Sequence, residues 1–382
     1  MLSRTPKVHG IHFIALLMLV LSTSSMLLAD ARAASTEQET LRHLKQLRAL
    51  PADASPDRLR QHNEAMDEAW KFYHGHRDEA LPVLRRELAA EVHKPKPAPL
   101  LLLDVASYLY LDGEPEDRMR SLQALLAIDP DAPTIQANFD QLFRLTHGLA
   151  PMADARLLPF IDRVFLPTER GVMLSEQSFT LNPTLMCAFL YGVYGAEGER
   201  HLQPMLKNPE RIERVMEVLK WLGSPDSVAA VEGAMPPKIE YDMFARELTF
   251  MMVNGGPQGR EAMLRLDSAR LDEQSKQHYE RVKPAIEAQV YAQLRKKFEQ
   301  FTGEQKVPDD KLKQQLATMY DNFGKDSRLN PQALLDSGLS KDYLIDELLK
   351  IRARMFTHAD NQTLSDIELT NAVLNALRYR DH

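Results

Sequence analysis

Apolar residues recur at helical spacing along most of this chain. Ile212, Val215, Met216 and Leu219 follow the i, i+3, i+4, i+7 pattern that places side chains on one face of a helix. Residues 100–111 are apolar almost all round, so this helix is expected to lie between neighbouring helices. No segment sustains the two-residue alternation of a half-buried strand. The pattern therefore predicts an all-α fold without a sheet.

The starts of several predicted helices carry a capping residue followed by proline. A serine or asparagine side chain accepts a hydrogen bond from a free backbone N–H of the first turn, and proline fits the first helical position. Such pairs are Ser55-Pro56, Asn182-Pro183, Asn208-Pro209, Ser224-Pro225 and Asn330-Pro331. Ser365 and Glu368 have the spacing of a capping box, which predicts a further helix start at Ser365.

Six glycines separate the predicted helices into pairs. They are Gly75, Gly113, Gly148, Gly195, Gly223 and Gly256, and their successive spacings range from 28 to 47 residues. One helical hairpin has this length, so the spacing favours an α-solenoid over residues 34–270. The expected hairpins pair 56–74 with 77–90, 99–111 with 115–128, 133–146 with 152–165, 183–194 with 198–206, 209–222 with 225–234, and 238–253 with 257–266. Residues 166–180 show no strong period and are expected to form a longer crossover or a functional loop.

The turn at residues 222–225 carries a recognisable sequence. Apolar residues lead into Leu222-Gly223-Ser224-Pro225, and a new helix follows at once. This turn resembles that of a HEAT-like repeat, and Ala127-Ile128-Asp129-Pro130 is similar to the end of a TPR-like repeat. The resemblance extends more loosely over residues 55–266. It implies a scaffold that binds a protein or peptide partner on a concave face, which the second helices of the hairpins would line at 116–128, 198–206 and 225–234.

The spacing and length of the predicted helices change after residue 270. A long apolar stripe runs from Val282 to Phe301, and three shorter helical patterns follow it. We therefore predict a helical C-terminal module over residues 271–382, which either caps the solenoid or forms a separate bundle.

The N-terminus has the pattern of a secretory signal peptide. Arg4 and Lys7 precede a run at residues 11–21 that is apolar apart from His12. Small residues then stand at −3 and −1 spacing, as Ala31 and Ala33 or as Ala29 and Ala31, which places cleavage near Ala33. We therefore expect residues 1–33 to be removed and the protein to be periplasmic or secreted. An uncleaved segment would instead anchor the protein in the inner membrane, which is the alternative location.

Composition and motifs narrow the chemistry that this chain can perform. The net charge is −7 and no long run of Lys and Arg is present, so no nucleic-acid partner is expected. The chain lacks a phosphate-binding loop, a dinucleotide fingerprint and a nucleophile elbow, so we predict no catalytic residue and no cofactor. The single Cys187 cannot form an internal disulfide, and its apolar surroundings predict an inert buried thiol.

The histidines offer one weak candidate for a metal site. His74 and His76 flank Gly75, with Asp78 and Glu79 close behind, and imidazole and carboxylate groups can bind a transition metal. However, the spacing matches no familiar zinc motif, and Gly75 is already explained as a hairpin turn. No metal is therefore expected. Four other histidines are expected at the surface, namely His43, His62, His147 and His201.

Two classes of function are compatible with these patterns. The first is an exported, non-enzymatic helical-repeat scaffold that binds a protein or peptide partner in the cell envelope. The alternative is an envelope hydrolase that acts on glycan or peptidoglycan, built as an α-superhelix or an (α/α) toroid. Such an enzyme needs paired carboxylates and an aromatic cleft, whereas this chain has only two tryptophans, Trp70 and Trp221.

Overall fold

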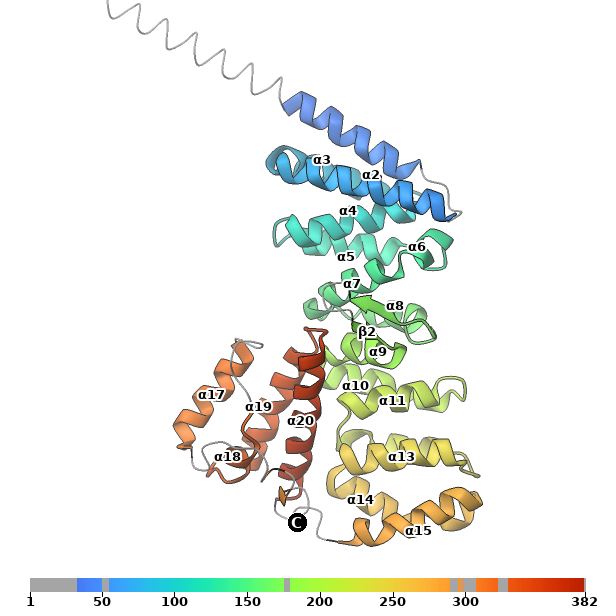
Figure 1. Ribbon diagram of the computed structural model, residues 1–382, viewed down its shortest axis with the longest axis vertical. Helices are drawn as coiled ribbons and strands as arrows, with labels where there is room; N and C mark the ends of the chain where they lie inside the picture. Colours follow the sequence, from blue (N-terminus) through green and yellow to red (C-terminus); the bar gives the residue numbers. More distant parts are fainter. Residues whose placement is uncertain are drawn as a thin grey trace, which may run out of the picture. The chain divides into compact units, whose positions relative to one another are not determined.

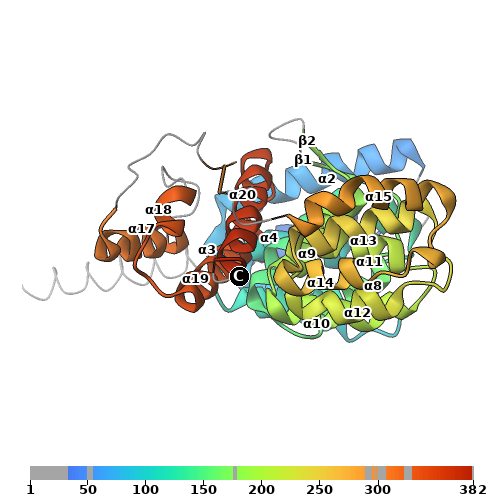
Figure 2. The ribbon, with the colours of Figure 1, turned by 90° about the horizontal axis from the view of Figure 1, so that it is seen from below.

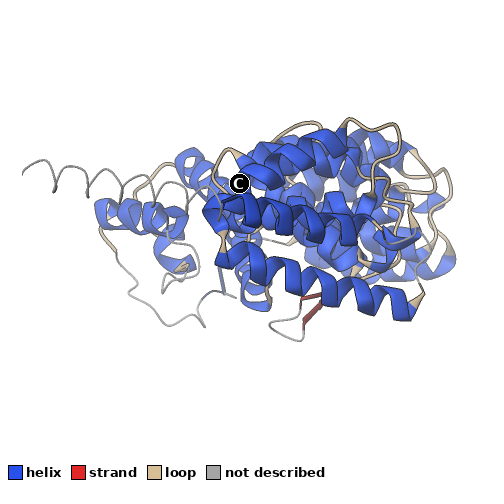
Figure 3. Cartoon of the chain, turned by 90° about the horizontal axis from the view of Figure 1, so that it is seen from above, coloured by secondary structure: helices blue, strands red, loops and turns tan. Residues whose placement is uncertain are grey.

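The computed structural model describes residues 33–49, 55–174, 179–288, 295, 296, 298, 307–321 and 329–380. Within these residues the protein is all-α with many packed helices, which confirms the predicted fold class (Figure 3). The chain divides into two compact units, Met1–Leu145 and Thr146–His382, and the division falls inside one helix. The predicted domain boundary at residue 270 lies within the second unit and stays a prediction.

The N-terminal unit consists of helices that follow one another along the chain (Figure 1). Its elements are a helix over residues 33–48, α2 (Pro56–Gly75), α3 (Arg77–Val92), α4 (Pro99–Asp112), α5 (Asp117–Ala127), α6 (Pro133–Ala137) and the first part of α7 (Phe139–Leu149). The first two predicted hairpins are therefore confirmed to within a few residues. The predicted helix at 133–146 is interrupted at Asn138, which separates α6 from α7. As its apolar sequence predicts, α4 is buried from Leu100 to Leu109.

The second unit begins with helix pairs and ends with the helices α17 to α20. Its elements are η1 (Ala150–Met152), α8 (Leu157–Val164), β1 (Val172–Leu174), β2 (Phe179–Leu181), α9 (Pro183–Gly192), α10 (Ala196–Leu202), η2 (Gln203–Lys207), α11 (Ile212–Leu222), η3 (Pro225–Ser227), α12 (Val228–Ala234), α13 (Tyr241–Val253), α14 (Gly256–Arg265), η4 (Ser268–Arg270), α15 (Glu273–Glu287), α17 (Asp309–Asp321), α18 (Pro331–Leu335), α19 (Lys341–Met355) and α20 (Asn361–Arg378). The helices expected in hairpins four to six are all present, although several start later than predicted.

A β-hairpin corrects the expectation that the fold contains no sheet. Strand β1 pairs antiparallel with β2, and Val172 lies opposite Leu181. Both of these side chains are fully buried, so the hairpin covers part of the core of its unit. Each strand has only three residues, which is too short for a two-residue alternation to be visible in the sequence.

The predicted helix starts are confirmed in part. The side chains of Asn182, Ser224 and Asn330 each accept a backbone hydrogen bond from the helical turn that follows. Ser55 precedes α2 but makes no such bond. Asn208 accepts from the N–H of Glu210 in a turn, so α11 begins later than expected.

Two predicted boundaries are wrong. Ser365 lies inside α20, because Asp360 caps this helix and accepts from the N–H of Thr363. Gly148 lies inside α7 instead of at a turn. The chain turns a few residues later, where Ala153 adopts a left-handed backbone conformation. At the start of α20, the helix is thus capped by the single side chain of Asp360, and the capping-box spacing of Ser365 and Glu368 does not mark the helix start.

Arginine side chains bind the C-terminal ends of five helices. A helix leaves its last carbonyls without partners and carries a partial negative charge there, so a guanidinium at this end is favourable by up to about 2 kcal/mol. Among the described residues, the contacts are Arg77 to Asp112 O (2.8 Å), Arg260 to Ile286 O (2.7 Å), Arg270 to Met235 O (3.1 Å), Arg352 to Leu222 O (2.7 Å) and Arg378 to Asn254 O (2.9 Å). In each case the arginine comes from a different element than the helix end that it binds.

Helix α20 packs across the ends of three earlier helices of its unit, α11, α13 and α14 (Figure 2). Asn371 donates to the carbonyl of Trp221 and Asn375 to that of Met252, each at 2.8 Å. The hydroxyl of Tyr379, just beyond the helix, donates to the carbonyl of Gly256 at 2.7 Å. Side chains of α20 and of Tyr379 thus donate hydrogen bonds to backbone carbonyls at the ends of the preceding helices. These contacts stabilise the packing, because buried carbonyls need donors.

Candidate functional site

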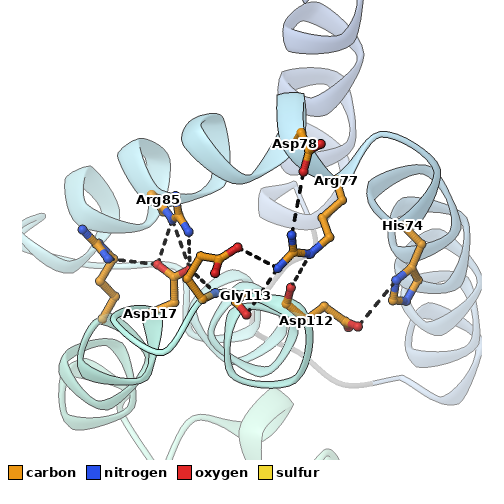
Figure 4. A network of polar contacts seen from close by, with 9 residues as sticks. His74, Arg77, Asp78, Arg85, Asp112, Gly113 and Asp117 are labelled. Carbon is orange, nitrogen blue, oxygen red and sulfur yellow. Dashed lines mark hydrogen bonds and ion pairs between the residues drawn. The ribbon is translucent and has the colours of Figure 1, made fainter.

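The two histidines of the weak metal candidate bind different partners. His74 Nδ1 lies 3.7 Å from Asp112 Oδ1 (Figure 4). In contrast, the ring of His76 stacks on that of Phe72 with a centroid distance of 4.4 Å. His76 Nδ1 is also 3.0 Å from the carbonyl of Phe72. In the part of the chain that the structure describes, no group of three or more His, Cys, Asp or Glu side chains could hold a metal ion.

The polar network beside His74 organises the turn between α4 and α5 (Figure 4). Asp117 is fully buried and accepts hydrogen bonds from Arg85, from Arg120 and from the N–H of Glu114. Burial alone would raise the pKa of Asp117, but the hydrogen bonds from Arg85 and Glu114 outweigh it and hold the pKa below its ordinary value. The carboxylate thus has donors from two arginines and from the backbone of the turn.

The N-terminal unit contains a pocket of about 350 Å³ that we call the Trp70 pocket. It is lined by Met66, Trp70, Ser107, Tyr110, Leu111 and Gln141, with Arg144 and Leu145 completing the wall. The volume falls in the range of small-molecule and side-chain binding sites. The side chain of Leu111 is 63% exposed, which is unusual for an aliphatic residue in an otherwise buried helix.

Three helices position these side chains. Met66 and Trp70 stand one turn apart on α2, and Ser107 and Leu111 stand one turn apart on α4, so each pair projects from one helix face. The ring of Trp70 contacts the buried Tyr108 edge-on at a centroid distance of 5.6 Å, which fixes its orientation. Gln141 and its neighbours come from α7. The pocket is therefore built by α2, α4 and α7, and the expected binding helix at 116–128 contributes no lining residue.

Two polar side chains, Ser107 and Gln141, line the Trp70 pocket next to each other, and we call them its polar floor. Gln141 Nε2 donates to Asp104 Oδ1 at 3.1 Å and to Ser107 Oγ at 3.2 Å. Beneath it, Asp104 Oδ2 lies 2.7 Å from His62 Nε2, and both of these side chains are only 1% exposed. The buried carboxylate therefore determines which way the Gln141 amide points, since it can only accept hydrogen bonds from that amide.

The expectation that four histidines lie at the surface is wrong for His43 and His62, which are buried against aromatic and acidic neighbours. His147 Nε2 is 2.8 Å from the carbonyl of Phe356, and burial lowers the pKa of this imidazole. His201 is partly exposed and contacts both carboxylate oxygens of Asp162. Histidine has an apolar ring with polar tips, so a core position is acceptable wherever a partner is at hand.

Cys187 is a buried free thiol, as predicted. Its Sγ donates to the carbonyl of Phe165 at 3.3 Å, and burial raises the pKa of the thiol to about 12. Because only the thiolate is nucleophilic, this cysteine is inert at physiological pH.

A second pocket in the other unit is small and charged. Glu217, Lys220 and Asp242 line it between α11 and α13, in a volume of about 210 Å³. Arg246 also lines it and lies 3.1 Å from Glu217. No aromatic side chain contributes to the described lining, so this pocket lacks the sugar-stacking platform that a glycosidase needs.

No protein-family model, curated protein or solved structure matches this chain. The described helices include none with the length and hydrophobicity of a membrane span. The predicted signal peptide lies outside the described residues except for Ala33. Sequence reasoning missed the Trp70 pocket, because its lining residues come from three helices and share no motif in the sequence.

Proposed function

We propose that this protein is an exported, non-enzymatic scaffold that binds a protein or peptide partner through the Trp70 pocket. The array of paired helices is in our proposal a HEAT-like or TPR-like α-solenoid. The observation that carries the proposal is the pocket itself, in which Trp70, Tyr110 and the exposed Leu111 surround a polar floor. Aromatic and aliphatic anchors around a few placed polar groups are typical of binding sites.

The chemistry of the pocket supports binding over catalysis. A serine nucleophile needs a base within hydrogen-bond reach, whereas Ser107 contacts the amide of Gln141. The nearest carboxylate, Asp104, is 1% exposed and already accepts from that amide. An acid–base pair that could cleave a glycan is therefore missing from the described lining of this pocket.

Leu111→Glu tests the binding role of the pocket. A charge at this position opposes burial of an apolar partner group, so we expect recovery of crosslinked partner protein from the cell envelope to fall about tenfold. Leu111 is largely exposed, and the variant is therefore expected to fold. Leu41→Glu is the matched control, since Leu41 is also an exposed leucine but lies outside the pocket. Equal recovery with both variants would overturn the proposed function.

The proposed location has an independent test. Export with cleavage predicts that the mature chain begins directly after Ala33, because the small residues before this position fit a signal-peptidase site. Edman sequencing of protein isolated from the periplasm would read Ala34-Ser35-Thr36 at its start. Recovery of the intact N-terminus from the membrane fraction would instead establish the anchored alternative.

A further inference from the structure

The polar floor of the Trp70 pocket has two unused hydrogen-bonding functions. The amide nitrogen of Gln141 donates to Asp104 and to Ser107. The amide carbonyl therefore points away from these two residues. Among the described residues, Gln141 Oε1 accepts no hydrogen bond and the hydroxyl hydrogen of Ser107 finds no acceptor. The floor thus offers one acceptor and one donor next to each other. Asp104 holds the Gln141 amide, and this amide in turn contacts Ser107 Oγ.

The other lining residues of the Trp70 pocket favour an occupant with a mostly apolar side chain. Trp70, Tyr110 and Leu111 contribute mostly carbon surface, which favours an aromatic or aliphatic group. A purely apolar group such as a phenylalanine ring would fill this space. However, it would also remove water from Gln141 Oε1 and Ser107 without replacing the lost hydrogen bonds, which is unfavourable.

The polar groups of the pocket disfavour a charged occupant. Arg144 is the charged residue of the described lining, and its positive charge disfavours a lysine or arginine side chain. The carboxylate of Asp104 cannot compensate, because it lies beneath the floor and is bound by Gln141. An ammonium can only donate hydrogen bonds and a carboxylate can only accept them, so neither can satisfy both Gln141 Oε1 and the Ser107 hydroxyl. The occupant is therefore neutral at its tip, with an apolar body behind it.

We infer that the Trp70 pocket binds the side chain of a tyrosine in an exposed segment of the partner. The phenol hydroxyl donates to Gln141 Oε1 and accepts from the hydroxyl of Ser107, so both unused functions are satisfied. A tryptophan fits less well, because its indole N–H can only donate and leaves Ser107 without an acceptor. This inference rests on the proposed function and names the chemical group by which the partner is recognised.

Calorimetric titration with capped five-residue peptides tests this inference. The probes are Ser-Gly-X-Gly-Ser peptides, acetylated and amidated, in which X is Tyr, Phe or Lys. Loss of the hydrogen-bonded hydroxyl corresponds to a tenfold change in affinity per about 1.4 kcal/mol, so we expect the Tyr peptide to bind about tenfold more tightly than the Phe peptide. The Lys peptide is expected to bind more weakly than either.

Two variants separate recognition of the hydroxyl from general binding. Ser107→Ala removes the donor of the floor but leaves the bond between Gln141 and Asp104 in place, so the preference for Tyr over Phe should fall severalfold. Met119→Ala, outside the pocket, should keep the full preference. Thermal unfolding of both variants checks that each is folded before the titrations are compared.

The outcomes distinguish this inference from the function on which it rests. Equal affinity for the Tyr and Phe peptides would overturn the inference and leave the pocket as a general apolar site. Absence of peptide binding, together with loss of partner recovery in Leu111→Glu, would overturn tyrosine recognition and support the scaffold function. Absence of peptide binding together with full partner recovery in Leu111→Glu would overturn both.

Discussion

Glu247→Gln is expected to stabilise the protein above pH 8 by about 3 kcal/mol relative to the wild type. The side chain of Glu247 is only 3% exposed, and its Oε2 has no hydrogen-bond partner among the described residues. Burial raises the pKa of this carboxyl to about 7; Arg270 opposes the shift and Glu232 adds to it. Ionisation above this pH places an uncompensated charge in the core of the second unit.

The pH dependence of this effect has a definite sign. The pKa is higher in the folded than in the unfolded state, so the wild-type protein is favoured at low pH, where the carboxyl is protonated in both states. Its stability falls as the pH rises from about 4.5 to about 7 and then levels off. The glutamine variant lacks this loss, and the difference between the two proteins should therefore grow with pH.

Urea unfolding at pH 5 and pH 8 measures this difference directly. Glu280→Gln provides the matched control, because Glu280 is exposed on α15 and should show little difference at either pH. A stability difference between Glu247→Gln and wild type that is the same at both pH values would contradict the prediction.

Arg352→Met is expected to destabilise the protein by about 3 kcal/mol or more. The guanidinium is 5% exposed and donates to the carbonyls of Leu222 and Gly223 and to Asn371 Oδ1. Burial lowers the pKa of Arg352 to about 10, so it remains charged at neutral pH. Methionine fills part of the volume but leaves Leu222 O and Asn371 Oδ1 without the guanidinium donors, whereas Gly223 O still accepts from Asn254 Nδ2. The two acceptors that lose their donors are the main cost of the substitution.

The control for this substitution lies two residues further along the same helix. Arg354 is exposed on α19. Arg354→Met therefore makes the same change in charge and composition as Arg352→Met, but it leaves the buried contacts of Arg352 intact. Chemical denaturation monitored by circular dichroism should place the midpoint of Arg352→Met well below that of wild type and that of Arg354→Met close to it. Equal midpoints for the two variants would show that the buried contacts contribute nothing to stability.

Local features of this fold could be predicted from sequence, because they depend on neighbouring residues. The stripe of Ile212, Val215, Met216 and Leu219 predicts α11, and all four side chains are buried in the structure. The helix cap at Asn182 is also local, because its side chain binds the backbone N–H of Leu185, three residues later. The β-hairpin was not predictable, because its pairing depends on a packed core beneath Val172 and its strands are too short to carry a period.

The candidate site could not be predicted from the sequence, because its residues come together only in the folded protein. Trp70, Leu111 and Gln141 come from three helices, and the period of each helix alone cannot say which exposed side chains will face one another. The buried position of His62 depends on Asp104, a residue of a different helix. Sequence pattern therefore indicated helices and turns, whereas the functional surface follows from packing between them.

The arginine contacts at the helix ends affect how freely this sequence can change. Each guanidinium binds main-chain carbonyls, as Arg77 does at Asp112 and Arg260 at Ile286. A carbonyl is supplied by any amino acid, so the residue at the receiving position can be replaced without loss of the contact. Divergent descendants of this protein could therefore keep the same stacked helices while their turn sequences lose all similarity, provided that each arginine or an equivalent donor is retained.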